Sequence, residues 1–171
     1  MQGYVANLLG ASAARRMGPP GTIAAARTFL RQLNLGEFSN PKTFAPTLEA
    51  ATLSLKAELP RGGQHWGSSR KFLNLFLRDA TYNYHLRNTF DLDRIESELE
   101  LPLDSFSAQG LIEESIDLQL SRWRGVIHLQ PSESNAYQQA ASAIAADKKP
   151  PVSRAHLDLV YWRRSKAKKS T

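Results

Sequence analysis

A lysine and an aspartate carry the clearest chemistry in the sequence. Lys71 ends the segment 59–71 (LPRGGQHWGSSRK) and leads into the most apolar stretch of the chain, and Asp104 lies in the segment 100–105 (ELPLDS). A lysine amine is a nucleophile when it is neutral, and a carboxylate in apolar company can act as a base in a dry site. The simpler interpretation of Asp104, which follows a proline at an expected helix start, is an N-cap.

The glycine-bearing turn before Lys71 has two interpretations. Free backbone N–H groups at a helix N-terminus bind phosphate together with the helix dipole, and Arg61 and Arg70 would add charge to such a site. The alternative is an ordinary turn between two helices.

A third segment, 153–164 (SRAHLDLVYWRR), places an aromatic ring near a carboxylate. Asp158 and Trp162 are four residues apart and share one face of a helix. This combination suits a nucleobase turned out of a duplex, because the ring stacks on the base and the carboxylate accepts from its N–H groups. The alternative is a core tryptophan with an incidental surface aspartate.

The hydrophobic period is helical nearly throughout, and no stretch has the alternation of a strand. We therefore predict an all-α fold, a single compact domain of about seven or eight helices. The helices expected after a short helix or loose arm at 5–16 are 22–33, 40–59 (with a break at Pro46 as an alternative), 69–84, 92–99, 104–120, 131–146 capped by Ser132, and one after Pro150. The expected organisation is a loosely packed N-terminal arm or short helix at 1–20, the helical domain at 21–165 and a basic tail at 166–171.

Composition excludes several classes of protein. The 171 residues, 42% of them hydrophobic, suffice for a core, and the absence of cysteine rules out disulfides, a thiolate nucleophile and cysteine-ligated metal or iron–sulfur sites. The four histidines form no metal-binding pattern, so we expect neither a metal nor a cofactor. No secretory signal or membrane span is evident, which favours a cytoplasmic, nucleoid-associated protein.

The net charge of +6 is unevenly distributed. Residues 91–117 contain nine acidic side chains and one basic side chain, which leaves 21 basic (22 − 1) and 7 acidic (16 − 9) residues in the rest of the chain. Clustered positive charge predicts a polyanionic partner, although a soluble basic protein with a solvated surface has the same composition.

Taken in order, the three segments resemble the helix-hairpin-helix DNA glycosylases over about residues 59–165. Residues 67–71 resemble the hairpin and catalytic lysine of that superfamily, and residues 102–105 resemble its loop with the catalytic aspartate. The separation of Lys71 and Asp104 by 33 residues (104 − 71) is similar to that of the archaeal 8-oxoguanine DNA glycosylase branch. That branch also has a motif similar to residues 156–162 in its C-terminal helix.

The resemblance implies a helix-hairpin-helix-like element and a DNA glycosylase that excises an oxidised or otherwise modified base, with AP lyase activity through a lysine Schiff base. It implies that Lys71 is the nucleophile and that Asp104 deprotonates it and stabilises the cation-like sugar. Lys71 should then be partly buried near a helix start, within hydrogen-bonding distance of Asp104 or one water away. Burial and the charge of the adjacent Arg70 would favour the neutral amine.

The same resemblance suggests the other site residues. The base pocket would contain Asp158 and Trp162, with Leu75 where the archaeal branch has an aromatic residue and Phe72 or Phe76 as its substitute. The remaining DNA contacts would come from His65 and Trp66, which fill the gap in the duplex, and from the phosphate-binding residues Arg61, Arg70, Arg163, Arg164 and the tail. We expect a monomer that binds double-stranded DNA and no membrane.

Three alternatives remain open at this point. A non-catalytic helix-hairpin-helix DNA-binding module would keep the fold without turnover. A defence glycosylase that acts on modified bases of phage DNA is compatible with Leu75, which opens the pocket. A helical protein–protein adaptor would use its basic tail only for solubility.

Overall fold

The protein is all-helical in the part of the chain that the computed structural model describes, which is residues 1–10, 16–115 and 120–167, with side chains up to Arg163. These ranges contain no β-strand, in agreement with the predicted fold class. No helix in them is long and apolar enough to cross a membrane. The α-helices are α1 (Gln2–Leu8), α2 (Thr22–Gln32), α3 (Pro41–Glu58), α4 (Trp66–Tyr82), α5 (Tyr84–Thr89), α6 (Ser105–Glu114), α7 (Pro131–Asp147) and α8 (Leu157–Ala167), and short 3₁₀ helices are η2 (Leu35–Phe38), η3 (Leu92–Ile95), η4 (Val126–His128) and η5 (Arg154–His156).

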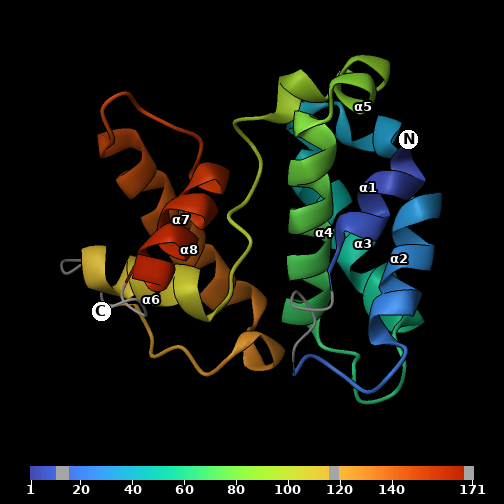
Figure 1. The fold of residues 1–171 in the computed structure, drawn as a ribbon, viewed down its shortest axis with the longest axis horizontal. Coiled ribbons are helices and arrows are strands. Elements are labelled where there is room, and N and C mark those ends of the chain that lie inside the picture. The colour runs from blue at the N-terminus through green and yellow to red at the C-terminus, as the bar shows by residue number, and fades with distance from the viewer. Residues whose placement is uncertain (11–15, 116–119, 168–171) are drawn as a thin grey trace.

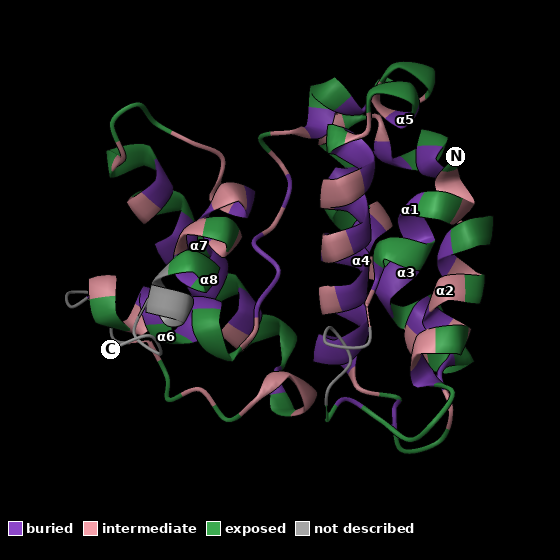
Figure 2. Ribbon diagram, in the orientation of Figure 1, coloured by how far each residue is buried: buried purple, intermediate pink, exposed green. Residues whose placement is uncertain are grey.

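The helices form two lobes joined by an extended segment (Figure 1). Helices α1 to α5 surround one hydrophobic cluster, and α6, α7 and α8 surround a second one that also includes Trp66 of α4. Figure 2 shows the buried residues on the inner sides of the helices in each lobe. The apolar residues therefore build two clusters, one in each lobe.

Local sequence explains where α3 begins and why it continues. The side chain of Asn40 caps the helix by accepting a hydrogen bond from the backbone N–H of Lys42 (3.1 Å), and Pro41 occupies the first turn, where its missing N–H costs nothing. Pro46 does not interrupt the helix. It is exposed, so water can satisfy the carbonyl group that the proline leaves unbonded.

The predicted helix at 92–99 is wrong beyond its first turn. Only η3 forms there, although Leu92, Ile95 and Leu99 are buried as an amphipathic pattern requires. The side chain of Arg154 donates to the carbonyl oxygens of Glu98 (2.8 Å) and Leu99 (2.9 Å), while the N–H groups of the same two residues donate to the carbonyl oxygen of Ile95. The carbonyl groups at the end of this segment therefore bond to a distant arginine, and the helix that the periodicity favoured ends after one turn.

Of the two expectations for the N-terminus, the structure has the short helix, since α1 forms and Val5, Ala6 and Leu9 are buried against the first lobe. One helix cap differs from the expected one. Helix α7 is capped by Gln130 rather than by Ser132, since Pro131 already occupies the first turn.

The segment between the lobes is fixed by buried polar contacts. Gln138 of α7 binds both the N–H (2.9 Å) and the carbonyl group (2.8 Å) of Leu101. Glu100 accepts hydrogen bonds from Arg70 and Asn74 of α4. The segment that ends at Asp104 is therefore held by both lobes, and this fixes the position of the Asp104 side chain.

Candidate active site

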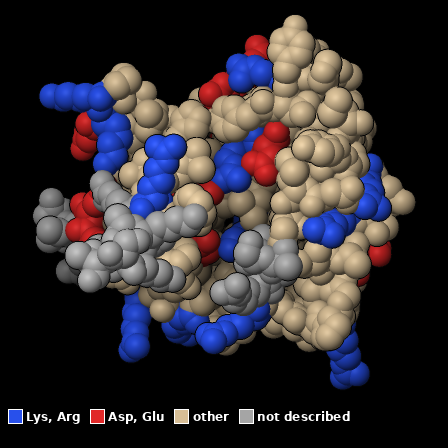
Figure 3. All heavy atoms as spheres, in the orientation of Figure 1, with Lys and Arg blue, Asp and Glu red and all other residues tan. Residues whose placement is uncertain are grey.

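One face of α4 points across to the second lobe. Lys71, Asn74 and Arg78 are spaced by three and four residues and so lie on the same side of the helix. Lys71 pairs with Asp104, Asn74 with Glu100 and Arg78 with Asp158, and all three partners lie in the linking segment or the second lobe. Figure 3 shows the surface hollowed between the lobes, with basic and acidic side chains together inside.

Lys71 and Asp104 meet as the sequence predicted. The Lys71 Nζ lies 3.5 Å from Oδ2 of Asp104, and the two side chains are 11% and 29% exposed. The other oxygen of Asp104, Oδ1, caps α6 by accepting from the N–H groups of Phe106 (2.9 Å) and Ser107 (3.1 Å). The cap and the ionic contact use different oxygens, so the two interpretations of Asp104 are compatible.

A second ion pair, between Arg78 and Asp158, lies beside the first. Arg78 also binds Asp79, and the two carboxylates raise the pKa of the guanidinium although burial opposes its charge. Burial raises the pKa of Asp158; Arg78 and Lys71 oppose this shift and Asp104 adds to it. The charges of Lys71 and Asp104 thus both affect the pKa of Asp158. We call the two ion pairs together, Lys71 with Asp104 and Arg78 with Asp158, the charged cluster.

Close packing of α6 on α8 brings the two carboxylates of the charged cluster together. A Cβ atom at Gly110 of α6 would lie 2.2 Å from the ring of Tyr161 of α8, and Tyr161 itself is 3% exposed. The missing side chain therefore lets the two helices approach. Asp104 caps α6 and Asp158 lies in the first turn of α8, so this approach holds them side by side.

Trp162 lies on the surface of α8 and not in the core. Its side chain is 47% exposed, whereas its neighbour Tyr161 is buried. The core interpretation of this tryptophan is therefore wrong. Trp162 lies one turn after Asp158 on the same helix, so its exposed ring is on the helix face of a member of the charged cluster.

Arg70 and Trp66 are structural residues, which corrects their expected role in DNA binding. Arg70 is 7% exposed and binds Glu100 through two hydrogen bonds (2.9 and 3.1 Å), Glu49 (3.3 Å) and Thr52 (2.9 Å). Its guanidinium lies over the ring of Trp66, whose Nε1 donates to Glu49 (2.9 Å). Because these partners neutralise and bury the guanidinium, Arg70 is not exposed to bind phosphate.

The rest of the start of α4 is also buried. Phe72 is fully buried in the first lobe, which removes it from the base pocket, while Leu75 is half-buried one turn after Lys71. A Cβ atom at Gly67 would lie 2.1 Å from the carbonyl oxygen of Val126. The first turn of α4 is thus covered by η4, and the expected phosphate site at this helix N-terminus is wrong.

The remaining predicted DNA contacts lie outside the charged cluster. Arg61 is exposed on the turn 59–65, and the ring of His65 is half-buried with Nε2 3.1 Å from the carbonyl oxygen of Gly62. Arg163 is exposed on α8. The side chain of Arg164 and the tail from 168 onward lie outside the described residues.

Arg78 is the member of the charged cluster that we did not predict. Its signal is present in the sequence, because it follows Lys71 by seven residues and so returns to the same face of the helix after two turns. The prediction concentrated on Leu75, one turn after the lysine, and on the neighbouring Arg70.

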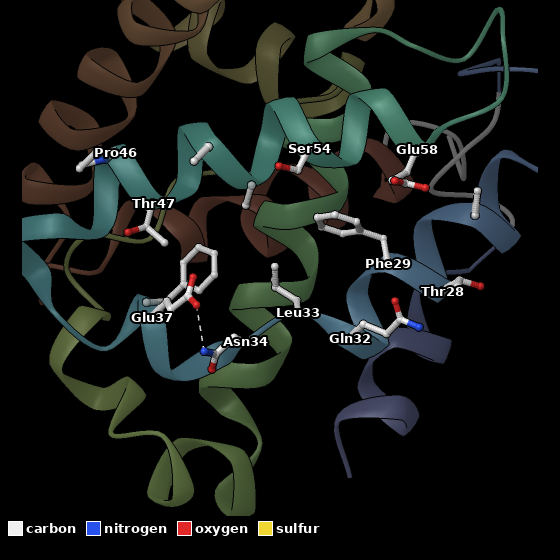
Figure 4. A pocket seen from close by; sticks show the side chains of 14 residues that line it. Thr28, Phe29, Gln32, Leu33, Asn34, Glu37, Pro46, Thr47, Ser54 and Glu58 are labelled. Carbon is white, nitrogen blue, oxygen red and sulfur yellow. Dashed lines mark hydrogen bonds between the residues drawn. The ribbon is translucent and has the colours of Figure 1, made fainter.

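A groove of about 960 Å³ lies elsewhere, between α2, α3 and η2 (Figure 4). Phe29 and Leu33 point into it, and Asn34 donates to Glu37 (2.9 Å) at one end. Glu37 and Glu58 are the charged residues among those that line it, and neither is basic. The groove lacks both a nucleophile with a partner and a match to a polyanion, so the charged cluster is the better candidate site.

In comparisons with protein-family models, with curated proteins and with solved structures, nothing matches this chain.

Proposed function

We propose that this protein is a DNA glycosylase with AP lyase activity, which removes an oxidised or otherwise modified base through Lys71 and Asp104. The observation that carries the proposal is the 3.5 Å approach of Lys71 Nζ to Asp104 Oδ2, made by residues 33 positions apart (104 − 71) on two different lobes. An amine and a carboxylate close to one another, each held at a helix, are the groups that such a reaction needs.

The proposed chemistry assigns one step to each group. Asp104 Oδ2 accepts a proton from Lys71, and the neutral amine attacks C1′ of the target deoxynucleoside. The bond between C1′ and the base breaks, and the base leaves with the electron pair and takes up the proton that Asp104 had accepted, which restores the negative charge of the carboxylate. Negative charge at Asp104 stabilises the cation-like sugar. Opening of the sugar ring gives a Schiff base on Lys71, and loss of a proton from C2′ then breaks the C3′–O bond.

Base recognition is assigned to the exposed ring of Trp162 and to Asp158. Arg78 holds one oxygen of Asp158 in place, so the carboxylate has a fixed orientation for accepting from an N–H group of the base. Stacking on Trp162 supplies a further 1–3 kcal/mol, roughly, for a base that has left the duplex. Helix α3, the turn 59–65 and α4 supply the two helices and the hairpin of the proposed helix-hairpin-helix element.

The proposal is tested by borohydride trapping on a panel of duplexes. Each duplex carries one oxidised purine, oxidised pyrimidine, modified cytosine or abasic site, and an unmodified duplex serves as control. Borohydride reduces the Schiff base to a stable amine, so we expect a covalent protein–DNA adduct with the abasic duplex and at least one modified duplex. Binding without an adduct on any duplex would indicate a non-catalytic DNA-binding module instead.

We expect Trp162→Ala to weaken base recognition without unfolding the protein. Preference for the modified over the normal base should fall by about 5- to 150-fold, which is the loss of roughly 1–3 kcal/mol of stacking. Cleavage of a ready-made abasic site should persist, because that site has no base to stack. The measurements are the two activities and a melting curve on one preparation.

The matched control for this prediction is Leu159→Ala, which truncates another exposed apolar side chain of α8 (53% exposed). It should leave both activities unchanged. A parallel loss of both activities and of melting temperature in Trp162→Ala would contradict the assignment to base recognition.

A further inference from the structure

A loop of the second lobe displays two arginines that the site described above does not use. The loop 120–129 contains η4, and Arg122 and Arg124 before it are exposed while Trp123 between them is half-buried. Trp123 packs edge-on against Tyr137 of α7 (ring centroids 5.6 Å apart), and the Tyr137 hydroxyl donates to the carbonyl oxygen of Ser121 (2.6 Å). The inward tryptophan anchors the loop and turns both arginines outward.

The charge of these arginines is largely free to meet a ligand. Arg124 forms an ion pair with Glu133 (3.1 Å) but keeps 63% of its side chain exposed. An exposed pair of this kind is worth little, and a guanidinium has further N–H groups to donate. His128 is also exposed at the end of the loop.

The loop lies beside the start of α4 and therefore beside the exposed Arg61. The clash that a Cβ atom at Gly67 would make with Val126 and Leu129 shows that η4 covers the first turn of α4, and the turn 59–65 leads directly into that turn. Lys71 is four residues beyond Gly67, about 6 Å along the helix axis. Basic side chains of both lobes project along the lower edge of Figure 3, where Figure 1 shows η4 and the start of α4.

We propose that Arg122 and Arg124 bind the phosphate backbone of double-stranded DNA. The inference rests on the proposed function and adds the surface that holds the duplex over Lys71 and Asp104. Two arginines on a rigid loop suit phosphate oxygens, because each guanidinium presents a planar set of donors. This loop replaces Arg70 and the first turn of α4, which the fold buries.

The test measures DNA binding of the double variant Arg122→Gln/Arg124→Gln against salt. Fluorescence anisotropy of a labelled 20-base-pair duplex gives the slope of log Kobs against log salt concentration. Loss of two phosphate contacts should make this slope less negative by about 1.8 and weaken binding at 0.1 M salt by at least about tenfold. The melting temperature should stay close to that of the wild type, because both side chains are exposed.

Two matched variants make the result specific. Arg122→Lys/Arg124→Lys keeps the charge and should keep most of the wild-type slope, and a loss equal to that of the glutamine variant would overturn the proposal by showing a structural role. Lys42→Gln/Arg94→Gln removes the same charge from exposed positions on α3 and η3, which belong to the first lobe and not to the loop 120–129. An equal change in this control would overturn it by showing that only net charge matters.

Borohydride trapping at saturating abasic duplex separates this inference from the proposed function. The glutamine double variant should still form the adduct at the wild-type level when DNA is in excess. A changed salt slope without any adduct in the wild type would refute the glycosylase while leaving the phosphate-binding loop intact. An unchanged slope, or tighter binding of duplex RNA than of duplex DNA, would refute the loop assignment even where trapping succeeds.

Discussion

Lys71→Gln is expected to abolish borohydride trapping while the protein still binds DNA. Glutamine has nearly the length and polarity of lysine but cannot form a Schiff base, so the adduct should fall by at least about 1000-fold. Glutamine can still donate a hydrogen bond towards Asp104, so the replacement should leave the protein folded. The measurements are adduct yield on an abasic duplex, duplex affinity and melting temperature.

The matched control is Lys148→Gln, which makes the same change in another lysine with an ion-pair partner. Lys148 Nζ lies 3.1 Å from Glu114 in the second lobe, away from the charged cluster. It should trap as well as the wild type. Adduct formation that survives in Lys71→Gln would mean that another amine is the nucleophile, and loss in both variants would mean that trapping reports stability rather than chemistry.

The sequence predicted those parts of the fold that depend on local signals. Helix α3 begins at the Asn40-Pro41 pair, and α6 begins at Asp104, because caps and first-turn prolines act within a few residues. The approach of Lys71 to Asp104 was also predicted, although from the resemblance and not from periodicity. A helix period gives the face of a residue but does not indicate which distant segment covers that face.

The failures share one physical cause, which is partners distant in sequence. Arg70 looked like a phosphate ligand because its type and place suit one, yet Glu49 and Glu100, 21 and 30 residues away, bury it. Trp66 was assigned to a DNA-contacting surface, yet it is buried at 7% exposure, where its ring lies under Arg70 and its Nε1 donates to Glu49. Residue type sets what a side chain can do, whereas its exposure is decided by tertiary contacts that one sequence does not display.

Asp104→Asn is expected to remove base release and to leave the fold intact. Asparagine keeps an oxygen that can accept from the N–H groups of Phe106 and Ser107, and it caps helices about as well as aspartate. It lacks the charge that faces Lys71 and the cation-like sugar. Base release should fall by at least about 100-fold, a barrier increase of about 2.7 kcal/mol, with little change in melting temperature or duplex affinity.

Comparison with Asp104→Ala separates the charge from the cap. Alanine removes both, so it should lose activity as asparagine does and also destabilise the protein by about 1 kcal/mol. Asp93→Asn, the same chemical change at an exposed residue of η3, is the control and should behave as the wild type. If Asp104 only caps α6, the asparagine variant will instead retain activity within about tenfold of the wild type, a barrier change of about 1.4 kcal/mol, and only the alanine variant will lose melting temperature.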